Sequence, residues 1–196
     1  EEKKINMIYI HKGEEPDFLR EFKSKNPDKN YDSEEFGTWR SILREQLCRE
    51  QKGLCAYCCS RISVERSHNE HIEPRNPKEY ANKRSLDYEN IVASCENKNT
   101  CGKKKQNNYD EAQFVSPLDV RCEEVFTYFA NGEIVGDEYT IDLLGLNHYD
   151  LKSARQAVYR MLQKMDKTTI EMSFMNSQEE YFPYYDVIKW YYSHCC

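Results

Sequence analysis

The chain has 196 residues and carries 28 Lys and Arg side chains against 34 Asp and Glu, which gives a formal net charge of −6. This length suits one domain with its own core, and the acidic balance argues against a protein that coats DNA by charge alone. No run of apolar residues approaches the ~18 that a transmembrane helix needs, and the charged first residues show no signal peptide, so we expect a cytoplasmic protein.

Residues 1–53 predict a strand followed by helices that buttress the chain beyond them. Residues 7–10 form a short apolar run that favours a strand, and Pro16 fits the first turn of a short helix. A second helix is expected to begin at Asp32. Glu35 stands three residues on as its capping-box partner, and apolar residues then recur at spacings of three and four.

Nine cysteines are many for a chain without an export signal, and five of them lie in two clusters. In a reducing compartment such clusters indicate metal ligands before disulfides. Four thiolates in two pairs close a tetrahedral structural zinc site, and unligated buried thiols are the alternative. The predicted zinc ligands are Cys55, Cys58, Cys95 and Cys101. Cys59 competes with Cys58, but its spacing from Cys55 is less usual.

The segment between the two cysteine pairs carries an acid followed by a histidine, Glu70-His71, and later an asparagine, Asn90. The Glu70 carboxylate can bind a hard divalent cation. His71, with an ordinary pKa near 6.5, can deprotonate an attacking water. A cation at a phosphate would neutralise the charge of the transition state. The pair therefore predicts metal-assisted hydrolysis.

Basic charge is concentrated in the same part of the chain. Residues 75–107 hold 8 basic and 4 acidic side chains, whereas residues 108–196 hold 7 and 15. The basic stretch ends in Lys103, Lys104 and Lys105. A short lysine run is often only a solvated face, but beside the cysteines it predicts contacts with DNA phosphates.

Residues 119–196 predict a hairpin and helices. Asn131 and Gly132 suit a type I′ hairpin turn between two apolar runs, and a helical apolar stripe follows over residues 151–165. The tail over residues 181–192 is rich in aromatic side chains. We interpret it as core packing, with a surface that docks a partner as the alternative.

The chemistry-bearing residues occur in a defined order: Cys55 and Cys58, Glu70-His71, Asn90, Cys95 and Cys101, then Lys105. This order resembles that of the zinc-bearing HNH nucleases. The resemblance implies an α+β fold with a zinc-stapled ββα-metal core at residues 54–118, flanked by N-terminal and C-terminal helices and a β-hairpin. It implies His71 as general base, Glu70 as a ligand of catalytic Mg²⁺ or Mn²⁺, and Asn90 as the residue that orients the loop and His71.

The chain departs from the HNH pattern at one position. The family usually has a second metal ligand, His or Asn, directly after the last cysteine, and here that position is Gly102. Asn99, inside the wide second cysteine pair, or Asn107, beyond the lysines, is expected to supply the missing ligand.

A narrower resemblance covers most of the chain. It is to the PtuB family, the HNH subunits of Septu anti-phage defence that also occur with some retrons. The segments that carry it lie at residues 7–10, 50–58, 70–74, 90–95, 101–105, 114–118 and 144–147. This resemblance implies an ABC/SMC-like ATPase of the PtuA type as partner and phage or plasmid DNA as substrate.

Two other functions compete with a nuclease. His68-Asn69-Glu70 fits the H-x-E of zinc deaminases, but those enzymes place their two zinc-binding cysteines after this motif and here Cys55 and Cys58 precede it. The stronger alternative is a non-catalytic zinc module that binds nucleic acid or protein, which Gly102 at the ligand position favours.

Overall fold

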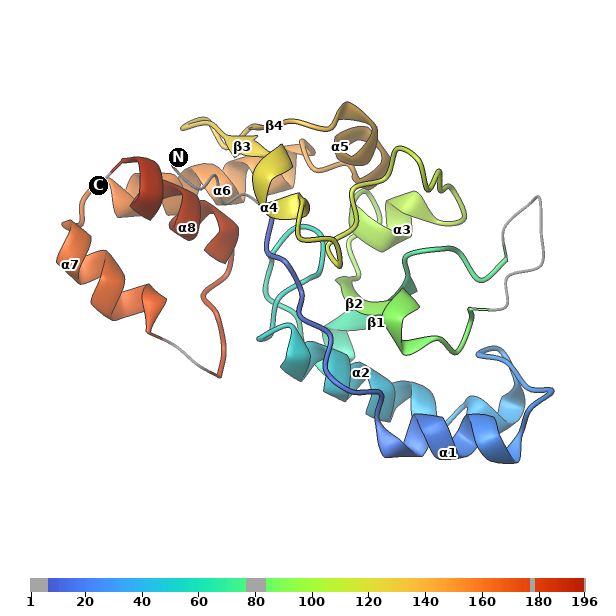
Figure 1. Cartoon of the computed structure of the whole chain (residues 1–196). Helices are drawn as coiled ribbons and strands as arrows, with labels where there is room; N and C mark the ends of the chain where they lie inside the picture. Colours follow the sequence, from blue (N-terminus) through green and yellow to red (C-terminus); the bar gives the residue numbers. More distant parts are fainter. Residues whose placement is uncertain (1–6, 77–83, 177–178, 196) are drawn as a thin grey trace.

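The computed structural model describes residues 7–76, 84–176 and 179–195, and the fold consists of short helices and two small antiparallel sheets (Figure 1). This mixed content agrees with the expected α+β class. Within the described ranges, no helix combines the length and the apolar character needed to cross a membrane.

The N-terminal region consists of an extended segment and helices. The helices are α1 (Asp17–Lys25), η1 (Glu34–Phe36) and α2 (Trp39–Glu50). The expected strand at residues 7–10 is extended, but neither sheet of the described chain includes it. Instead the N–H groups of Met7 and Ile10 donate to the carbonyls of Cys122 and Pro117 at 3.3 and 2.9 Å. The start of the described chain is thereby fastened to its C-terminal half.

The helix expected from Asp32 begins instead at Trp39. Residues Glu34–Phe36 form a separate 3-10 turn, and Gly37 behind them weakens a continuous helix because of its conformational freedom. In the turn the Phe36 ring is fully buried and meets the Phe22 ring edge to face, with 4.9 Å between centroids. Burying such a ring contributes roughly 1.5–3 kcal/mol, which favours the turn.

A ββα unit lies at the centre of the molecule (Figure 1). Its elements are η2 (Val64–Arg66), β1 (Ser67–His71), η3 (Tyr88–Asn90), β2 (Ile91–Cys95) and α3 (Cys101–Lys105). The strands are antiparallel, so Ser67 pairs with Cys95 at one end and His71 pairs with Ile91 at the other. All of β2 is buried, since α2 and α3 both contact it. The unit therefore has two distinct ends along one strand pair.

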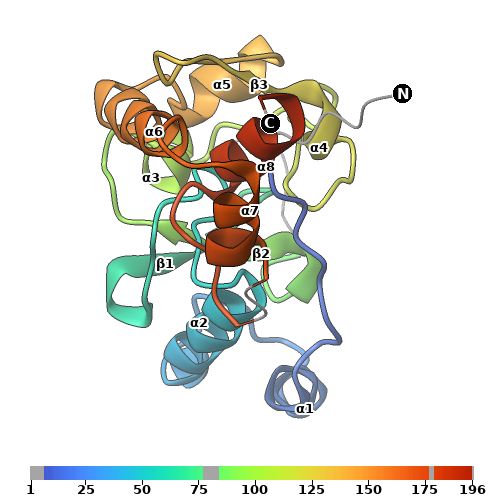
Figure 2. The same cartoon turned by 90° about the vertical axis from the view of Figure 1, so that its left-hand side faces the viewer.

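The C-terminal region packs mainly helices around a small hairpin, and Figure 2 shows α6, α7 and α8 gathered on one side. Its elements are α4 (Cys122–Val125), β3 (Thr127–Tyr128), β4 (Ile134–Val135), α5 (Glu138–Leu144), α6 (Tyr149–Leu162), α7 (Lys167–Ile170), η4 (Glu171–Met175) and α8 (Tyr185–His194). The predicted helical stripe corresponds to α6. Domain boundaries at 53/54 and 118/119 stay predictions.

The predicted hairpin is present, with a shorter first strand than its apolar run suggested. The predicted type I′ turn is wrong, because Asn131 does not adopt the positive φ that this turn requires. Instead the N–H of Gly132 donates to the carbonyl of Phe129 at 2.8 Å. Thr127 and Tyr128 pair with Val135 and Ile134, whereas the residues just before them belong to α4. Gly132 has φ +82° at the turn, and the backbone carbonyl of Lys152 lies where a Cβ would be. This close approach to α6 leaves room only for glycine.

The aromatic tail is largely core. Tyr185, Val187, Ile188 and Tyr191 of α8 are buried, and α8 packs against α6. The Tyr181 and Tyr185 rings stack with 4.2 Å between centroids. This agrees with core packing as the main role of the tail, and its docking of a partner stays a prediction.

Candidate metal centre and active site

Four cysteines meet at one end of the ββα unit. The sulfur atoms of Cys55, Cys58, Cys95 and Cys101 all lie within 4.8 Å of one another, and all four residues are buried. The Sγ atoms of Cys58 and Cys95 are 4.0 Å apart. A tetrahedral ion with zinc–sulfur bonds of ~2.3 Å sets its sulfurs about 3.8 Å apart. The cluster can therefore hold a metal ion such as zinc.

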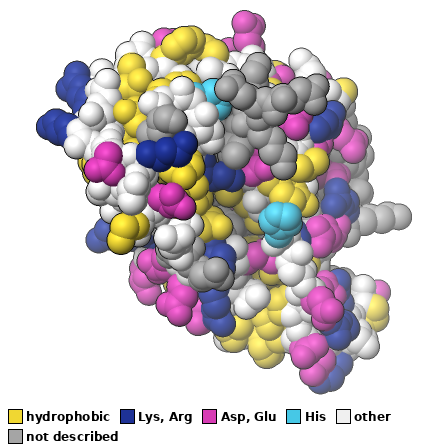
Figure 3. Space-filling model, turned by 60° about the vertical axis from the view of Figure 1, so that its left-hand side comes forward, with side chains coloured by type: hydrophobic (Ala, Val, Ile, Leu, Met, Phe, Trp, Pro, Cys, Tyr) yellow, Lys and Arg dark blue, Asp and Glu magenta, His cyan; other side chains and the backbone are white. Residues whose placement is uncertain are grey.

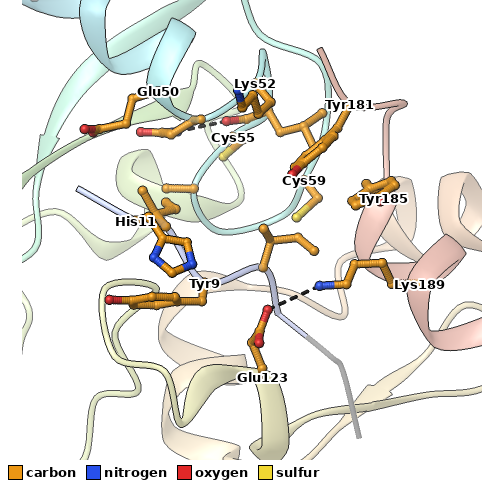
Figure 4. Close-up of a pocket in the computed structure, with 15 residues that line it drawn as sticks. Tyr9, His11, Glu50, Lys52, Cys55, Cys59, Glu123, Tyr181, Tyr185 and Lys189 are labelled. Atoms are coloured by element: carbon orange, nitrogen blue, oxygen red, sulfur yellow. Dashed lines mark hydrogen bonds and ion pairs between the residues drawn. The ribbon is translucent and has the colours of Figure 1, made fainter. Parts of the chain in front are cut away.

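Local backbone geometry separates Cys58 from its neighbour Cys59. Cys59 adopts φ +55°, and its N–H donates to the carbonyl of Cys55 at 3.1 Å. This left-handed residue takes its side chain out of the sulfur cluster and into the lining of another cavity (Figure 4). Of the two competing ligands, the structure therefore places Cys58 among the four sulfurs.

Contacts within the cluster favour the thiolate, the form that binds metals, at Cys95 and Cys55. The pKa values of the Cys58 and Cys101 thiols are instead raised, by hydrogen bonds with their sulfur neighbours and by burial. The N–H of Cys95 donates to Sγ of Cys55 at 3.3 Å. Hydrogen bonds from Cys101, Cys55 and Cys58 lower the pKa of the Cys95 thiol. Burial opposes ionisation of Cys55, but hydrogen bonds from Cys101 and Cys58 still lower its pKa.

Glu70 lies toward the other end of the unit, and its two oxygens have different partners. Its Oε1 accepts from Nζ of Lys105 at 3.0 Å and from the hydroxyl of Tyr57 at 3.3 Å. Burial raises the pKa of a carboxyl, but the hydrogen bond from His68 and the charge of Lys105 outweigh it, so the pKa of Glu70 is lowered. The carboxylate is thus kept ionised although it is only 7% exposed.

The buried position of Lys105 corrects one sequence prediction. Its side chain has no exposed surface, and its ammonium donates to Glu70 and, at 2.9 Å, to the carbonyl of His71. An ammonium enclosed in this way does not reach a DNA phosphate, so the predicted DNA contact of Lys105 is wrong. Its role is to position Glu70 and the end of β1.

His71 is buried and its ring orientation is fixed. Nε2 lies 2.9 Å from the carbonyl of Ser85, so this nitrogen carries the proton and Nδ1 keeps its lone pair. The edge of the ring contacts Tyr31, with 4.7 Å between centroids. Burial lowers the pKa of His71 to about 4. The imidazole is therefore neutral near pH 7 and able to accept a proton.

Asn90 fastens the chain that follows His71. Its Oδ1 accepts from the N–H of Glu73 at 2.8 Å, and its Nδ2 donates to the carbonyls of Glu73 and Arg84 at 3.0 and 3.3 Å. Its carbonyl also accepts from the N–H of Ile72 at 3.0 Å. Asn90 is only 1% exposed, so it acts on the loop from inside.

A cavity of about 290 Å³ opens beside these residues. It brings together several predicted site residues and one that was not predicted: Glu70, His71, Lys103, Asn107 and His68. Of the two asparagines expected to supply a second ligand, Asn107 lines this cavity. Asn99 is exposed and not part of its lining, and its carbonyl lies beside Gly145.

The other two lysines of the run are partly engaged by the protein. Lys103 pairs with Glu96 at 2.8 Å, and the ammonium of Lys104 donates to the carbonyl of Asp142. On the face shown in Figure 3, basic and acidic side chains are interspersed. DNA contacts by Lys103 and Lys104 stay predictions.

Sequence reasoning assigned no role in this site to His68 and Tyr57. In a strand, residues two apart share a face, so the H-x-E spacing of His68 and Glu70 already placed them side by side. The Nε2 of His68 and the Oε2 of Glu70 are 3.4 Å apart. Tyr57 lies in the loop between Cys55 and Cys58, and its hydroxyl donates to Glu70 on β1. No spacing in the sequence indicates this contact.

A second cavity, of about 390 Å³, lies between the N-terminal segment and the C-terminal tail (Figure 4). Its labelled side chains include Tyr9, Tyr181 and Tyr185, and an ion pair between Glu123 and Lys189 at 3.3 Å borders it. Cys55 also contributes to the lining of this second cavity, so the cavity borders the sulfur cluster.

Two curated proteins are similar to this chain. It is 29% identical over 144 residues to a protein of Vibrio cholerae serotype O1 biovar El Tor named "Retron Vc95 putative HNH endonuclease", across 65% of this chain and 69% of that protein. It is 24% identical over 139 residues to the Escherichia coli protein named "Retron Ec83 putative HNH endonuclease", across 67% of this chain and 50% of that protein. No protein-family model matches the chain. The two similarities support an HNH endonuclease family, and hence a nuclease.

Proposed function

We propose that the protein is a metal-dependent HNH endonuclease that hydrolyses DNA phosphodiester bonds, with β1, β2 and α3 as its ββα-metal core. One observation carries the proposal. An ionised, buried Glu70 and a neutral, oriented His71 line one cavity next to a helix that begins at a four-cysteine cluster. The similarity to the two retron proteins supports the same activity.

His71 is the general base in this proposal. Its Nε2–H is occupied by the carbonyl of Ser85, so Nδ1 is the atom that accepts the proton of the attacking water. Lys105 holds the carbonyl of His71 itself, and Asn90 holds the backbone at Glu73, two residues further on. Such positioned proton transfer typically contributes 10²–10⁴-fold to a rate.

Glu70 is the ligand of the catalytic cation, Mg²⁺ or Mn²⁺. Lys105 and Tyr57 hold Oε1, while Oε2 lies next to Gly102 and His68, residues that line the cavity. An oxygen of this kind fits a hard cation. Bound there, the cation would neutralise charge on the phosphate and stabilise the leaving oxygen.

The four cysteines form a closed structural zinc site. Cys55 and Cys58 come from the loop after α2, Cys95 ends β2 and Cys101 begins α3. One ion on these ligands would fasten all three segments together. A site with four protein ligands has no open position for substrate, so zinc would support the fold and leave hydrolysis to the other end.

We further propose the PtuB-like role, as the nuclease of an anti-phage complex in the cytoplasm with an ABC/SMC-like ATPase. The sequence resemblance supports it, and the names of both relatives associate those proteins with retrons. A net charge of −6 and a buried Lys105 leave few cations for DNA. Since phosphate contacts dominate affinity for DNA, a partner that holds DNA would complement this chain.

Plasmid cleavage tests the nuclease. Zinc-loaded protein with Mg²⁺ or Mn²⁺ is expected to nick or linearise supercoiled DNA, alone or with the ATPase, and His71→Ala to abolish this. His11 is exposed and is not among the residues that line the cavity at Glu70, so His11→Ala provides the matched control and should cleave like the wild type. Wild-type protein that leaves the plasmid intact with every metal, with and without the ATPase, would contradict the proposal.

The second candidate function is a non-catalytic zinc module that binds nucleic acid or protein. Gly102 favours it, because no side chain projects from the position that usually provides a second ligand for the catalytic cation. The two functions diverge in the plasmid experiment, since a binding module retains DNA or protein binding without any strand cleavage.

A further inference from the structure

We propose that His68 is the second protein ligand of the divalent cation, so that Nε2 of His68 and Oε2 of Glu70 hold it together. This inference rests on the proposed metal-dependent nuclease and names a residue that the usual HNH pattern does not use. The two atoms are 3.4 Å apart on one face of β1, and both side chains line the same cavity.

Gly102 makes this arrangement possible. A Cβ at position 102 would lie 2.7 Å from Nε2 of His68 and would also collide with Oε2 of Glu70. A side chain there would therefore take the space that the imidazole occupies. The loss of a ligand on α3 and the presence of a histidine two residues before Glu70 are complementary changes at one point of the site.

The other ring nitrogen of His68 lies close to a carboxylate. Nδ1 is 3.2 Å from Oε1 of Glu96 without a hydrogen bond between them, and Glu96 is paired with Lys103 at 2.8 Å. Metal-binding histidines commonly face a carboxylate with the nitrogen that does not bind the metal, which fixes the tautomer and makes the ligand more basic. Glu96 is the carboxylate that would take this place when Nε2 binds a cation.

The two oxygens of Glu70 have different partners, which leaves one of them for a metal ion. Oε1 accepts hydrogen bonds from Lys105 and Tyr57, whereas Oε2 faces the imidazole of His68. Without a metal this contact is an ion pair if His68 is protonated. With a metal the same two atoms become neighbouring ligands, and water and phosphate oxygens complete the coordination.

An imidazole ligand also predicts a metal preference. Mg²⁺ prefers oxygen ligands and near-ideal octahedral geometry. An imidazole nitrogen is a better ligand for a transition-metal ion such as Mn²⁺ than for Mg²⁺. The pair of His68 and Glu70 should therefore bind Mn²⁺ more tightly than Mg²⁺. Replacing His68 by an oxygen ligand should move the preference toward Mg²⁺.

Mn²⁺ binding to zinc-loaded full-length protein tests the inference, measured by calorimetry and by the electron paramagnetic resonance signal of free Mn²⁺. Wild type should bind one Mn²⁺ besides its zinc. His68→Ala and Glu70→Gln should each weaken Mn²⁺ binding by at least about tenfold. Loss of a residue that only contacts a metal ligand already costs about that much, and loss of a ligand should cost no less. The control His11→Ala should bind like the wild type.

His68→Asp provides a second, independent reading. It should bind Mn²⁺ more tightly than His68→Ala, and its ratio of Mg²⁺ to Mn²⁺ dissociation constants should be smaller than that of the wild type. Zinc content and circular dichroism verify that each variant is folded. If His68→Ala loses its zinc or its fold, the ratio measured on His68→Asp decides.

The outcomes separate this inference from the nuclease itself. Equal Mn²⁺ affinity in wild type and folded His68→Ala, or no Mn²⁺ binding by wild type, overturns the role of His68, whatever the plasmid assay shows. Loss of Mn²⁺ binding in His68→Ala supports it, even if the wild type cleaves no plasmid; in that case the nuclease proposal fails and the metal site stands.

Discussion

The two ends of the ββα unit differ in what closes them. At the end where Ser67 pairs with Cys95, four cysteine sulfurs face one another and no substrate-sized space remains between them. Toward the end where His71 pairs with Ile91, Glu70 and two histidines border a cavity of about 290 Å³. The sulfur end is closed by protein side chains that could hold an ion, whereas the other end opens into a cavity.

Helix α3 connects these ends and explains how one supports the other. Cys101 is its first residue and Lys105 its last. Fixing Cys101 in the sulfur cluster holds the start of the short helix whose last residue donates to Glu70 and to the carbonyl of His71. The comparison predicts an asymmetry: damage to the sulfur end should disrupt both ends, and damage to the cavity end should leave the sulfur end intact.

The largest effect is expected from Cys95→Ser. Removing one thiolate should abolish zinc binding and unfold the unit, since structural zinc sites in small domains contribute apparent binding free energies of about 10–16 kcal/mol. Zinc content per chain and thermal unfolding measure this. Cys59→Ser is the matched control, because Cys59 is equally buried but lies outside the cluster. Full zinc content in Cys95→Ser would contradict the role of the sulfur end as a zinc site.

Lys105→Met should come next. It removes one partner of a buried ion pair and leaves Glu70 without its main compensating charge, which typically costs about 3–5 kcal/mol. Urea unfolding should show the loss while zinc stays bound. Lys104→Met, one residue away and exposed, should leave stability nearly unchanged. Equal stabilities of the two variants would show that the enclosed contact at Glu70 does not form.

A smaller and more local effect is expected from Asn90→Ala. The variant removes three hydrogen bonds that Asn90 makes to the backbone of Glu73 and Arg84, each worth about 0.5–1.5 kcal/mol. Cleavage should fall through kcat with zinc retained, because the loop after His71 is released. A change confined to DNA affinity would instead assign Asn90 to binding.

The smallest effect is expected at Asp186, a buried carboxyl outside the ββα unit that can be compared with Glu70. Asp186 of α8 is buried and accepts from the Tyr128 hydroxyl at 2.5 Å, but it has no ammonium in the role of Lys105, and burial raises its pKa above 3.8. A raised folded pKa stabilises the fold below pH 3.8, and this stabilisation is lost as the pH rises through the folded pKa. Wild type should therefore lose stability relative to Asp186→Asn as the pH rises above about 4, measured by denaturant unfolding. A constant difference would contradict this.

The order of residues along the chain predicted much of the candidate site. Paired cysteines at knuckle spacing have few alternatives in a reducing compartment, and the four predicted ligands do come together. Glu70 and His71 line one cavity, and the roles that the resemblance implies for them stay predictions. These features depend on local spacing, which is visible in a sequence.

What the sequence could not show was which charges are enclosed. Three consecutive lysines look alike, and only the orientation of α3 distinguishes Lys105 from Lys103 and Lys104. The start of α2 was missed for another reason, because burial of the distant Phe22 and Phe36 rings against each other outweighs a local capping pattern.

Anomalous diffraction tests whether one unit holds two different metals at its two ends. Crystals grown with zinc and Mn²⁺ would be measured on both sides of each absorption edge. We expect a zinc peak among the sulfurs of Cys55, Cys58, Cys95 and Cys101, and a manganese peak between Oε2 of Glu70 and Nε2 of His68. Absence of zinc from the sulfurs, or a cavity that stays without manganese at saturating Mn²⁺, would contradict this expectation.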